Sequence, residues 1–282
     1  MANLRDIRRR IKSVKNTAQI TRAMQLVAAA KMKKAQDQAL AGRDYSKQLS
    51  SVLQDISEGY SDATHPLLEI REGARELVLV ISTDKGLCGA INTNLARIVR
   101  AKSTPATDFV TCGRKLRVML EKLGSTIIAD FSAKDPIVFA EARSIANLLS
   151  KKFLDGDYDR VSIAYNRFVN TMSQVPEIVQ LLPVVPPTGA SEKADETHEF
   201  IFEPSPSDVL SAILPLYINY RVFQALVEAR ASEHSARMVA MKSATDNAKK
   251  FIKELTLEYN KLRQGAITSE LLEITTAMKA ME

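Results

Sequence analysis

The segment Thr83–Ala90 (TDKGLCGA) has the composition of a turn that could bind phosphate. It follows an apolar, β-branched run and precedes a candidate helix, whose first backbone N–H groups could bind an anion. Its spacing differs from that of nucleotide-binding motifs, because Lys85 precedes the first glycine, no Gly-Lys-Ser/Thr ending follows, and the glycines do not match Gly-x-Gly-x-x-Gly. We therefore interpret Gly86 and Gly89 as residues of a tight strand-to-helix turn, with nucleotide binding as the alternative.

The other reactive side chains form no catalytic or metal-binding pattern. His65, His198 and His234 are far apart in the sequence, and no second histidine follows His234 at the spacing of a zincin-type site. Residues 155–159 (DGDYD) resemble the start of a calcium loop but lack the later glutamate, so we interpret them as a solvated turn. No Gly-x-Ser-x-Gly motif is present. The sequence thus predicts no catalytic residue, no metal site and no bound cofactor.

The chain has two cysteines, Cys88 and Cys112. They form neither a disulfide framework nor a metal-ligand spacing, and they suit a reducing compartment. We expect both to be small buried apolar side chains near strand ends.

Both ends of the chain are predicted to form helices far longer than the average of about 11–12 residues. Residues 3–57 contain no proline and one glycine, Gly42, and residues 216–282 contain no proline and one glycine, Gly265. Such ends are more typical of a shaft or a scaffold than of an enzyme built around a pocket.

Apolar residues recur in both ends with alternating steps of three and four, which is the pattern of a coiled-coil seam. The C-terminal seam comprises Met238, Met241, Thr245, Ala248, Ile252, Leu255, Tyr259, Leu262 and Ala266. The N-terminal seam comprises Leu4, Ile7, Ile11, Val14, Ala18, Ala28, Met32, Ala35 and Ala39, with Thr21 and Gln25 as polar members and with Ile20, Met24 and Val27 as a second stripe beside it. We predict that the two ends pair as an antiparallel coiled coil. The alternative is that each end packs against other subunits or pairs in a dimer.

Positive charge is concentrated in residues 1–50, which contain 12 Lys and Arg against 3 Asp and Glu, a net charge of +9. Basic helices often bind nucleic acid, but no aromatic residue precedes Tyr45, no zinc-finger or basic-zipper spacing occurs, and the seam continues through the basic segment. We therefore expect this helix to face acidic protein surfaces and no nucleic acid. No apolar run approaches the 18 residues of a membrane-spanning helix, so no membrane span is expected. The basic N-terminus loosely resembles a mitochondrial transit peptide, but the seam within it indicates part of the mature helix.

The middle of the chain alternates strands with helices and predicts a mostly parallel sheet covered by helices. Strands are expected at 76–83, 108–112, 125–131, 160–166 and 199–203, with one more strand or extended edge ending near Leu182, and helices at 92–102, 114–123 and 139–154. Residues 183–198 are rich in proline and charge and are expected to form an exposed loop.

Motifs at several separate positions resemble the gamma subunit of F-type ATP synthases. Residues 11–34 (IKSVKNTAQITRAMQLVAAAKMKK) resemble the start of that family, and residues 231–238 (ASEHSARM), 244–248 (ATDNA) and 260–270 (NKLRQGAITSE) resemble its C-terminal signature. The DKGLCG loop, residues 165–168 (YNRF) and residues 214–217 (LPLY) are similar to further family motifs. The resemblance covers nearly the whole chain in the expected order.

This resemblance implies an α/β fold in which a long antiparallel coiled coil of the N- and C-terminal helices carries an inserted Rossmann-like α/β domain. Residues 1–60 and 208–282 would form the coiled coil, and residues 61–207 would form the α/β foot. In the family, the coiled coil lies inside a ring of alternating alpha and beta subunits, and the foot contacts the epsilon subunit and the membrane ring of c subunits. The implied function is a non-catalytic rotor that couples rotation of the c-ring to successive conformations of the catalytic beta subunits.

The resemblance also implies that seven residues contact beta subunits, with solvation of a helix face as the alternative for the polar ones. Four match the family's Arg-Gln pair and the polar positions just after it: Arg263, Gln264, Thr268 and Glu270. Three match the region that faces the acidic lower lobes of the beta subunits: Met24, Arg22 and Lys31.

The chain departs from the family pattern at its C-terminus. Family members commonly end with Glu-Ile and a small-residue tail containing glycine, whereas Glu273 and Ile274 precede TTAMKAME. A second glycine expected after DKGLCG is replaced by Ala90. No cysteine-bearing insertion like that of the redox-regulated chloroplast form is present, so thiol switching is not expected. Because no cleavable leader precedes the first helix, we expect a bacterial protein, peripheral on the cytoplasmic side of the inner membrane.

Overall fold

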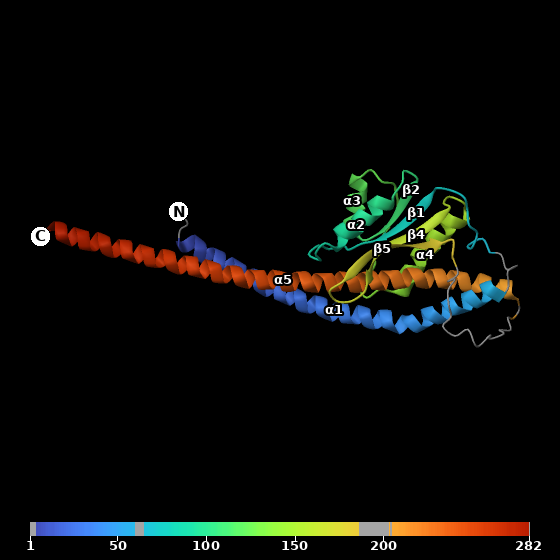
Figure 1. The fold of residues 1–282 in the computed structure, drawn as a ribbon, viewed down its shortest axis with the longest axis horizontal. Coiled ribbons are helices and arrows are strands. Elements are labelled where there is room, and N and C mark those ends of the chain that lie inside the picture. Colours follow the sequence, from blue (N-terminus) through green and yellow to red (C-terminus); the bar gives the residue numbers. More distant parts are fainter. Residues whose placement is uncertain (1–3, 60–64, 186–202, 204, 282) are drawn as a thin grey trace. The chain divides into compact units, whose positions relative to one another are not determined.

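The computed structural model of this chain describes residues 4–59, 65–185, 203 and 205–281, and its contacts divide the chain into two compact units. The terminal unit consists of Met1–Ala29 and Arg237–Glu282, and the body unit consists of Ala30–Ala236. Two long helices, α1 (Leu4–Gly59) and α5 (Pro206–Met281), contribute residues to both units (Figure 1). The long helices predicted at both ends of the chain are therefore confirmed.

The body unit contains a five-stranded sheet with the strand order β3-β2-β1-β4-β5. Its strands are β1 (Glu76–Ile81), β2 (Thr107–Cys112), β3 (Ile127–Phe131), β4 (Arg160–Phe168) and β5 (Gln174–Leu182). β1 is parallel to β2 and β4, β2 is parallel to β3, and β5 is antiparallel to β4. The predicted mostly parallel sheet is confirmed, and the additional strand expected before Leu182 is the antiparallel edge strand β5. The strand predicted at 199–203 and most of the loop predicted at 183–198 lie outside the described residues.

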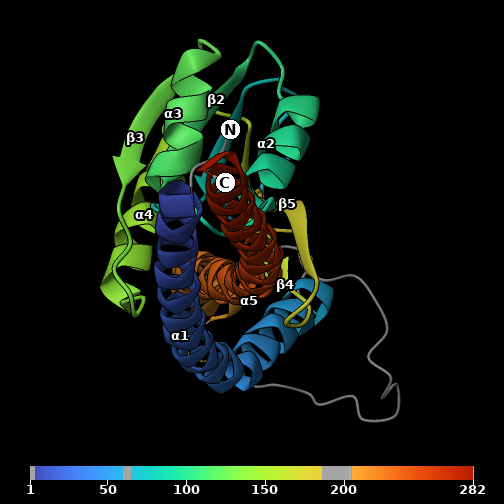
Figure 2. The same cartoon turned by 90° about the vertical axis from the view of Figure 1, so that its left-hand side faces the viewer.

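Helices α2 (Ile91–Lys102) and α3 (Arg114–Lys122) cover one face of the sheet (Figure 2). The buried cluster on that face contains Val78, Val80, Leu95, Val99, Phe109, Leu116, Leu120 and Ala164. In β1, Val78 and Val80 alternate with Leu77, Leu79 and Ile81, which belong to the cluster on the opposite face. Since β1 is buried on both faces, its sequence is a continuous apolar run and does not alternate with polar residues.

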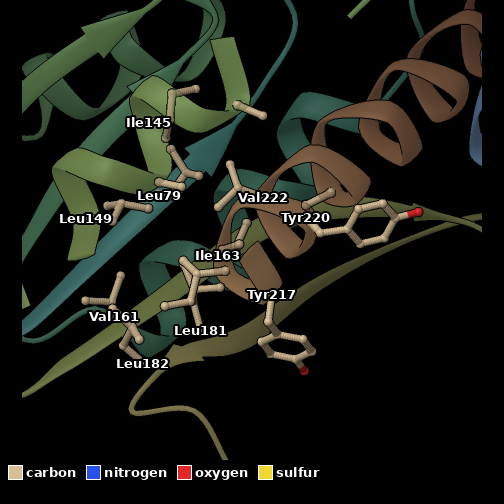
Figure 3. Packing of buried hydrophobic residues seen from close by; sticks show 14 of the residues in the cluster. Leu79, Ile145, Leu149, Val161, Ile163, Leu181, Leu182, Tyr217, Tyr220 and Val222 are labelled. Carbon is tan, nitrogen blue, oxygen red and sulfur yellow. The ribbon is translucent and has the colours of Figure 1, made fainter. Parts of the chain in front are cut away.

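Helix α4 (Phe139–Leu154) and the adjoining parts of α1 and α5 pack against the second face. Figure 3 shows Ile145 and Leu149 of α4 and Val222 of α5 close to Leu79 of β1 and Ile163 of β4. None of these five side chains is more than 4% exposed. Burial of this kind contributes about 1.5–3 kcal/mol per large aliphatic side chain, so α5 is a structural element of the body and not only an attachment to it.

In the terminal unit, α1 and α5 bury the seam that the sequence predicts. Thr21 Oγ1 and Thr245 Oγ1 lie 2.7 Å apart and share a buried hydrogen bond between the two helices. The seam residues of this unit up to Tyr259 are buried or half-buried, whereas Ile20 and Val27 of the second stripe are about 60% exposed. The seam does not continue to Leu262 and Ala266, as the sequence predicted, because every side chain from Asn260 to Met281 is exposed.

Helix α5 begins at Pro206, two residues before the predicted coiled-coil segment 208–282 and ten before the proline-free stretch 216–282, and it contains Pro215. Ser205 caps its start, because Asp208 N donates to Ser205 Oγ at 3.2 Å and Ser205 Oγ donates to Asp208 Oδ2 at 2.6 Å. A serine followed by proline and an acidic residue in the first turn is a helix start signal. Pro215 removes one hydrogen bond of the helix, but the neighbouring Leu214 is fully buried against the body.

One 18-residue window of the helix segment Ser207–Met281 has a mean hydropathy of 1.2, enough by length and composition to cross a membrane. No uninterrupted apolar run in the sequence marks this window, and the expectation of no membrane span is not contradicted. Of that window, 44% is buried within the protein, and a helix that packs in the core of a protein meets the same criterion. This is weak support for a membrane span.

Candidate partner-binding surface

The loop after β1, residues 82–90, is joined to the start of α3 by hydrogen bonds. Three N–H groups at the start of α3 donate to it: Arg114 N to Asp84 Oδ1 at 3.2 Å, Lys115 N to the Thr83 carbonyl at 3.0 Å, and Leu116 N to Ser82 Oγ at 3.2 Å. The first N–H donors of α3 are therefore occupied, whereas the turn predicted as a possible phosphate site precedes α2.

The same loop is fixed to the start of α2 through Asn92. Asn92 Nδ2 donates to Thr83 Oγ1 at 2.8 Å, and Thr83 N donates to Asn92 Oδ1 at 3.3 Å. The left-handed backbone conformations fall at Leu87 (φ 62°) and Gly89 (φ 65°), not at Gly86. The interpretation of this segment as a tight turn is supported, with the correction that a leucine and not the first glycine has the positive φ.

The carboxyl ends of β1 and β4, where doubly wound sheets bind their ligands, are covered by α5. Arg230 and Glu233 of α5 line a cavity there of about 10 Å³, together with Asp84 and Asn166. Such a space holds about one water molecule and no nucleotide. Among the described residues, no group of three or more His, Cys, Asp or Glu side chains could hold a metal ion.

Both cysteines are buried, Cys88 with 1% and Cys112 with 2% of its surface exposed. Cys112 ends β2, as expected, and burial raises its thiol pKa to about 12. Cys88 Sγ lies 3.5 Å from Asn92 Nδ2 inside the closed loop. A catalytic or redox-sensing cysteine has a low pKa and an accessible thiol. Cys112 has neither property, and Cys88 is not accessible.

Four of the predicted partner-binding residues lie on the exposed C-terminal segment of α5: Arg263, Gln264, Thr268 and Glu270. Thr268 Oγ1 donates to the Gln264 carbonyl of its own helix at 2.9 Å, so this hydroxyl is partly satisfied before any partner binds. An apolar stripe follows the same segment at helical spacing: Ile267, Leu271, Ile274 and Met278, each at least 48% exposed.

The three predicted residues of α1 are separated by the structure. Arg22 is exposed and Met24 is half-buried, both in the terminal unit. Lys31 belongs to the body unit, where its Nζ donates to Asp135 Oδ2 at 2.7 Å. Sequence reasoning missed Asp135, because 104 residues separate it from Lys31 and no local pattern marks it.

Comparison with known proteins shows full-length similarity. Residues 3–281 match the family model described as ATP synthase. An ATP synthase gamma chain of Akkermansia muciniphila is 50% identical over 291 residues and covers 100% of both chains, and one of Methylacidiphilum infernorum is 46% identical with the same coverage.

Solved structures show the same fold. The rotor of the Euglena gracilis mitochondrial ATP synthase includes a chain with a TM-score of 0.71 and 22% identity, covering 94% of this chain and 98% of that one. The central stalk and c-ring structure of the Tetrahymena thermophila mitochondrial ATP synthase includes a chain with a TM-score of 0.62 and 26% identity, covering 80% and 99%.

Proposed function

This chain belongs to the ATP synthase gamma family, and from that premise we propose that it is the central-stalk rotor of a proton-translocating F-type ATP synthase. In this role it couples rotation of a membrane c-ring to successive conformations of the catalytic beta subunits. The observation that carries the proposal is the terminal unit, in which two paired helices continue into a fully exposed segment of α5. The two solved structures described above, which are named as a rotor and a central stalk, contain chains with the same fold as this one.

A rotor acts by making different contacts with each partner conformation, because a ligand shifts an equilibrium only by its differential affinity for the two states. The exposed segment of α5 is suited to this, since Arg263 and Glu270 present opposite charges and Ile267 and Leu271 present apolar surface. These four side chains lie at helical spacing on one side of α5, and that side differs from the opposite one, which carries Gly265 and Ser269. Turning it would present different chemistry in turn to each of the surrounding subunits.

We propose that the chain is itself non-catalytic. Its strand-end loop accepts hydrogen bonds from the first N–H groups of α3, and Arg230 and Glu233 of α5 line the small cavity at the strand ends where a doubly wound sheet would bind a nucleotide. The nucleotides and catalytic residues would then belong to the alpha and beta subunits, and the chain would regulate ATP hydrolysis and proton flow through its contacts.

The proposed beta-subunit contacts are Arg263, Gln264, Thr268 and Glu270 on α5, and Arg22, Met24 and Lys31 on α1. Residues 61–207 are proposed as the foot, which would contact the epsilon subunit and the c-ring, with residues 1–60 and 208–282 as the coiled coil. The whole would be peripheral to the membrane sector, on the cytoplasmic side of a bacterial inner membrane.

Site-specific photo-cross-linking in the native complex tests this proposal. A cross-linking residue at Arg263 or Arg22 should yield products with beta subunits, because both side chains are exposed in the terminal unit. The matched control is Lys122, an exposed cation on α3 in the body unit, which should yield no beta product. ATP hydrolysis by the purified chain alone, or equal beta cross-linking from all three positions, would contradict the proposal.

A further inference from the structure

The loop between β3 and α4, residues 132–138, contacts both long helices within the body unit. The Asp135 carboxylate accepts a hydrogen bond from Lys31 Nζ of α1 at 2.7 Å. The same oxygen, Oδ2, lies 3.2 Å from Nε2 of His234 on α5. One carboxylate oxygen thus contacts two helices whose contacting residues are more than 200 positions apart in the sequence.

Backbone carbonyls on either side of Asp135 repeat this arrangement. The Ala133 carbonyl accepts a hydrogen bond from Arg230 Nη2 of α5 at 2.9 Å, and the Ile137 carbonyl accepts one from Gln38 Nε2 of α1 at 2.9 Å. Ala133 and Ile137 are 8% and 4% exposed, so their side chains seat the loop in the core of the body unit. The loop therefore contacts each long helix at two residues.

The electrostatic surroundings keep Asp135 ionised. Partial burial by itself raises the pKa of this carboxyl, but the hydrogen bond from Lys31 and the positive charges of His234, Lys31 and Arg230 outweigh it, and the pKa lies below its ordinary value. Arg230 is held in turn by Glu233, with Nη1 and Oε2 2.8 Å apart. The facing groups are thus Lys31 from α1 and Arg230, Glu233 and His234 from α5.

We propose that Asp135 is a positioning residue that fixes the body-unit segments of α1 and α5 to the sheet together, so that these segments and the sheet turn as one piece. This rests on the rotor function proposed above, because only a rotor transmits torque between these elements. Rotation of either helix about its own axis would break a short charge-assisted hydrogen bond or separate His234 from the shared oxygen.

Stability of the fold alone would not require one carboxylate to contact both long helices. The Lys31 and Asp135 side chains are 46% and 28% exposed, and partly exposed ion pairs add little to stability. The Lys152–Asp157 pair is a matched comparison, since its Nζ and Oδ2 atoms are 2.8 Å apart, yet it joins α4 only to the turn after it. Losing that pair should affect no contact with a long helix.

The test uses assembled ATP synthase with a rotation marker attached to the body unit of this chain. Asp135→Asn should broaden the angular distribution of the marker during catalytic pauses and lower the number of protons pumped per ATP hydrolysed. Asp135→Glu should restore both quantities, and the matched control Asp157→Asn should leave both unchanged. Gln38→Leu, which removes a neutral contact between the same loop and α1, should also broaden the distribution if Asp135→Asn fails to assemble.

The outcomes separate the two proposals. A wild-type angular distribution and proton ratio in both Asp135→Asn and Gln38→Leu would overturn the positioning role while leaving the rotor function intact. The same broadening in Asp157→Asn would also overturn it, since the effect would then follow any lost ion pair. A marker that does not turn in the wild-type complex would instead overturn the rotor function.

Discussion

At the scale of single residues, side chains of this protein take the places that a ligand would occupy in a doubly wound sheet. The Asp84 carboxylate accepts from Arg114 N at the start of α3, which is the interaction that a bound anion would make. Gly113, the residue before that helix, has φ 108°, and a Cβ there would lie 2.2 Å from the Ser82 carbonyl oxygen. The turn between β2 and α3 is therefore built for close packing of its backbone against Ser82.

The thiol of Cys112 gives a prediction at this scale. Burial raises its pKa to about 12, well above neutral pH, so very little of this thiol is in the reactive thiolate form at pH 8. A raised pKa keeps the thiol protonated until the pH approaches that value, so labelling by a thiol reagent should stay slow between pH 7 and pH 9. Both buried cysteines should react once the chain is unfolded in urea.

Colorimetric thiol titration with and without denaturant provides the measurement. A cysteine introduced at the exposed Ser13 is the positive control and should label quickly in the native protein. Fast labelling of Cys112 in the folded chain would show that its surroundings are more open than the structure indicates.

At the scale of elements, the buried pair of Thr21 and Thr245 interrupts an otherwise apolar seam. Each hydroxyl also lies near a carbonyl of its own helix, Ala18 O at 3.1 Å and Met241 O at 2.8 Å. Two hydroxyl protons therefore serve three acceptors, and removal of one hydroxyl leaves the other without its partner across the seam. A polar pair of this kind specifies the register of two helices at some cost in stability.

We expect Thr21→Val or Thr245→Val alone to lower the free energy of unfolding by about 1 kcal/mol, because one hydroxyl loses its cross-helix partner. The double variant should recover most of that loss, since both polar groups are then replaced by methyl groups of similar shape. Urea unfolding of the full chain, followed by helical circular dichroism, measures both effects. Thr256→Val is the matched control, because Thr256 is an exposed threonine of α5 whose hydroxyl donates to the Ile252 carbonyl of the same helix. Strictly additive losses in the double variant would contradict this account.

Helices and strands were predictable where the local sequence determines the structure. Features that depend on contacts between distant parts of the chain were not predictable. The strand 76–81 and helix 139–154 follow from apolar runs and periodicity, because burial on known faces forces those patterns. The proline-free stretch begins only at residue 216, whereas the family resemblance placed the start of the coiled coil at residue 208, two residues after α5 begins at Pro206. The capping signal of Ser205 was not used. The antiparallel direction of β5 and the contact of Asp135 with Lys31 depend on pairings that no local pattern encodes. The seven predicted partner-binding residues remain predictions.

At the scale of the whole molecule, the folded chain leaves apolar surface without a covering element in its described part. Ile267, Leu271 and Ile274 are 48%, 58% and 54% exposed, and they lie on one stripe of α5. An exposed apolar stripe of this kind marks an interaction surface more often than a structural requirement. The stability of the chain and its function should therefore depend on different parts of the same helix.

Replacement of Ile267, Leu271 and Ile274 together by Gln should leave the thermal unfolding midpoint of the isolated chain unchanged, because these side chains bury little surface in it. The same variant should reduce ATP synthesis by the assembled complex, since the rotor would lose apolar contacts with its surrounding subunits. The matched control is Leu255→Ala on the same helix, 4% exposed, which should lower the free energy of unfolding by roughly 2–5 kcal/mol. Calorimetry of the chain and synthesis assays of the complex separate the two effects. A lowered unfolding midpoint in the triple variant, or full ATP synthesis by its complex, would show that the exposed stripe is not the partner surface of this rotor.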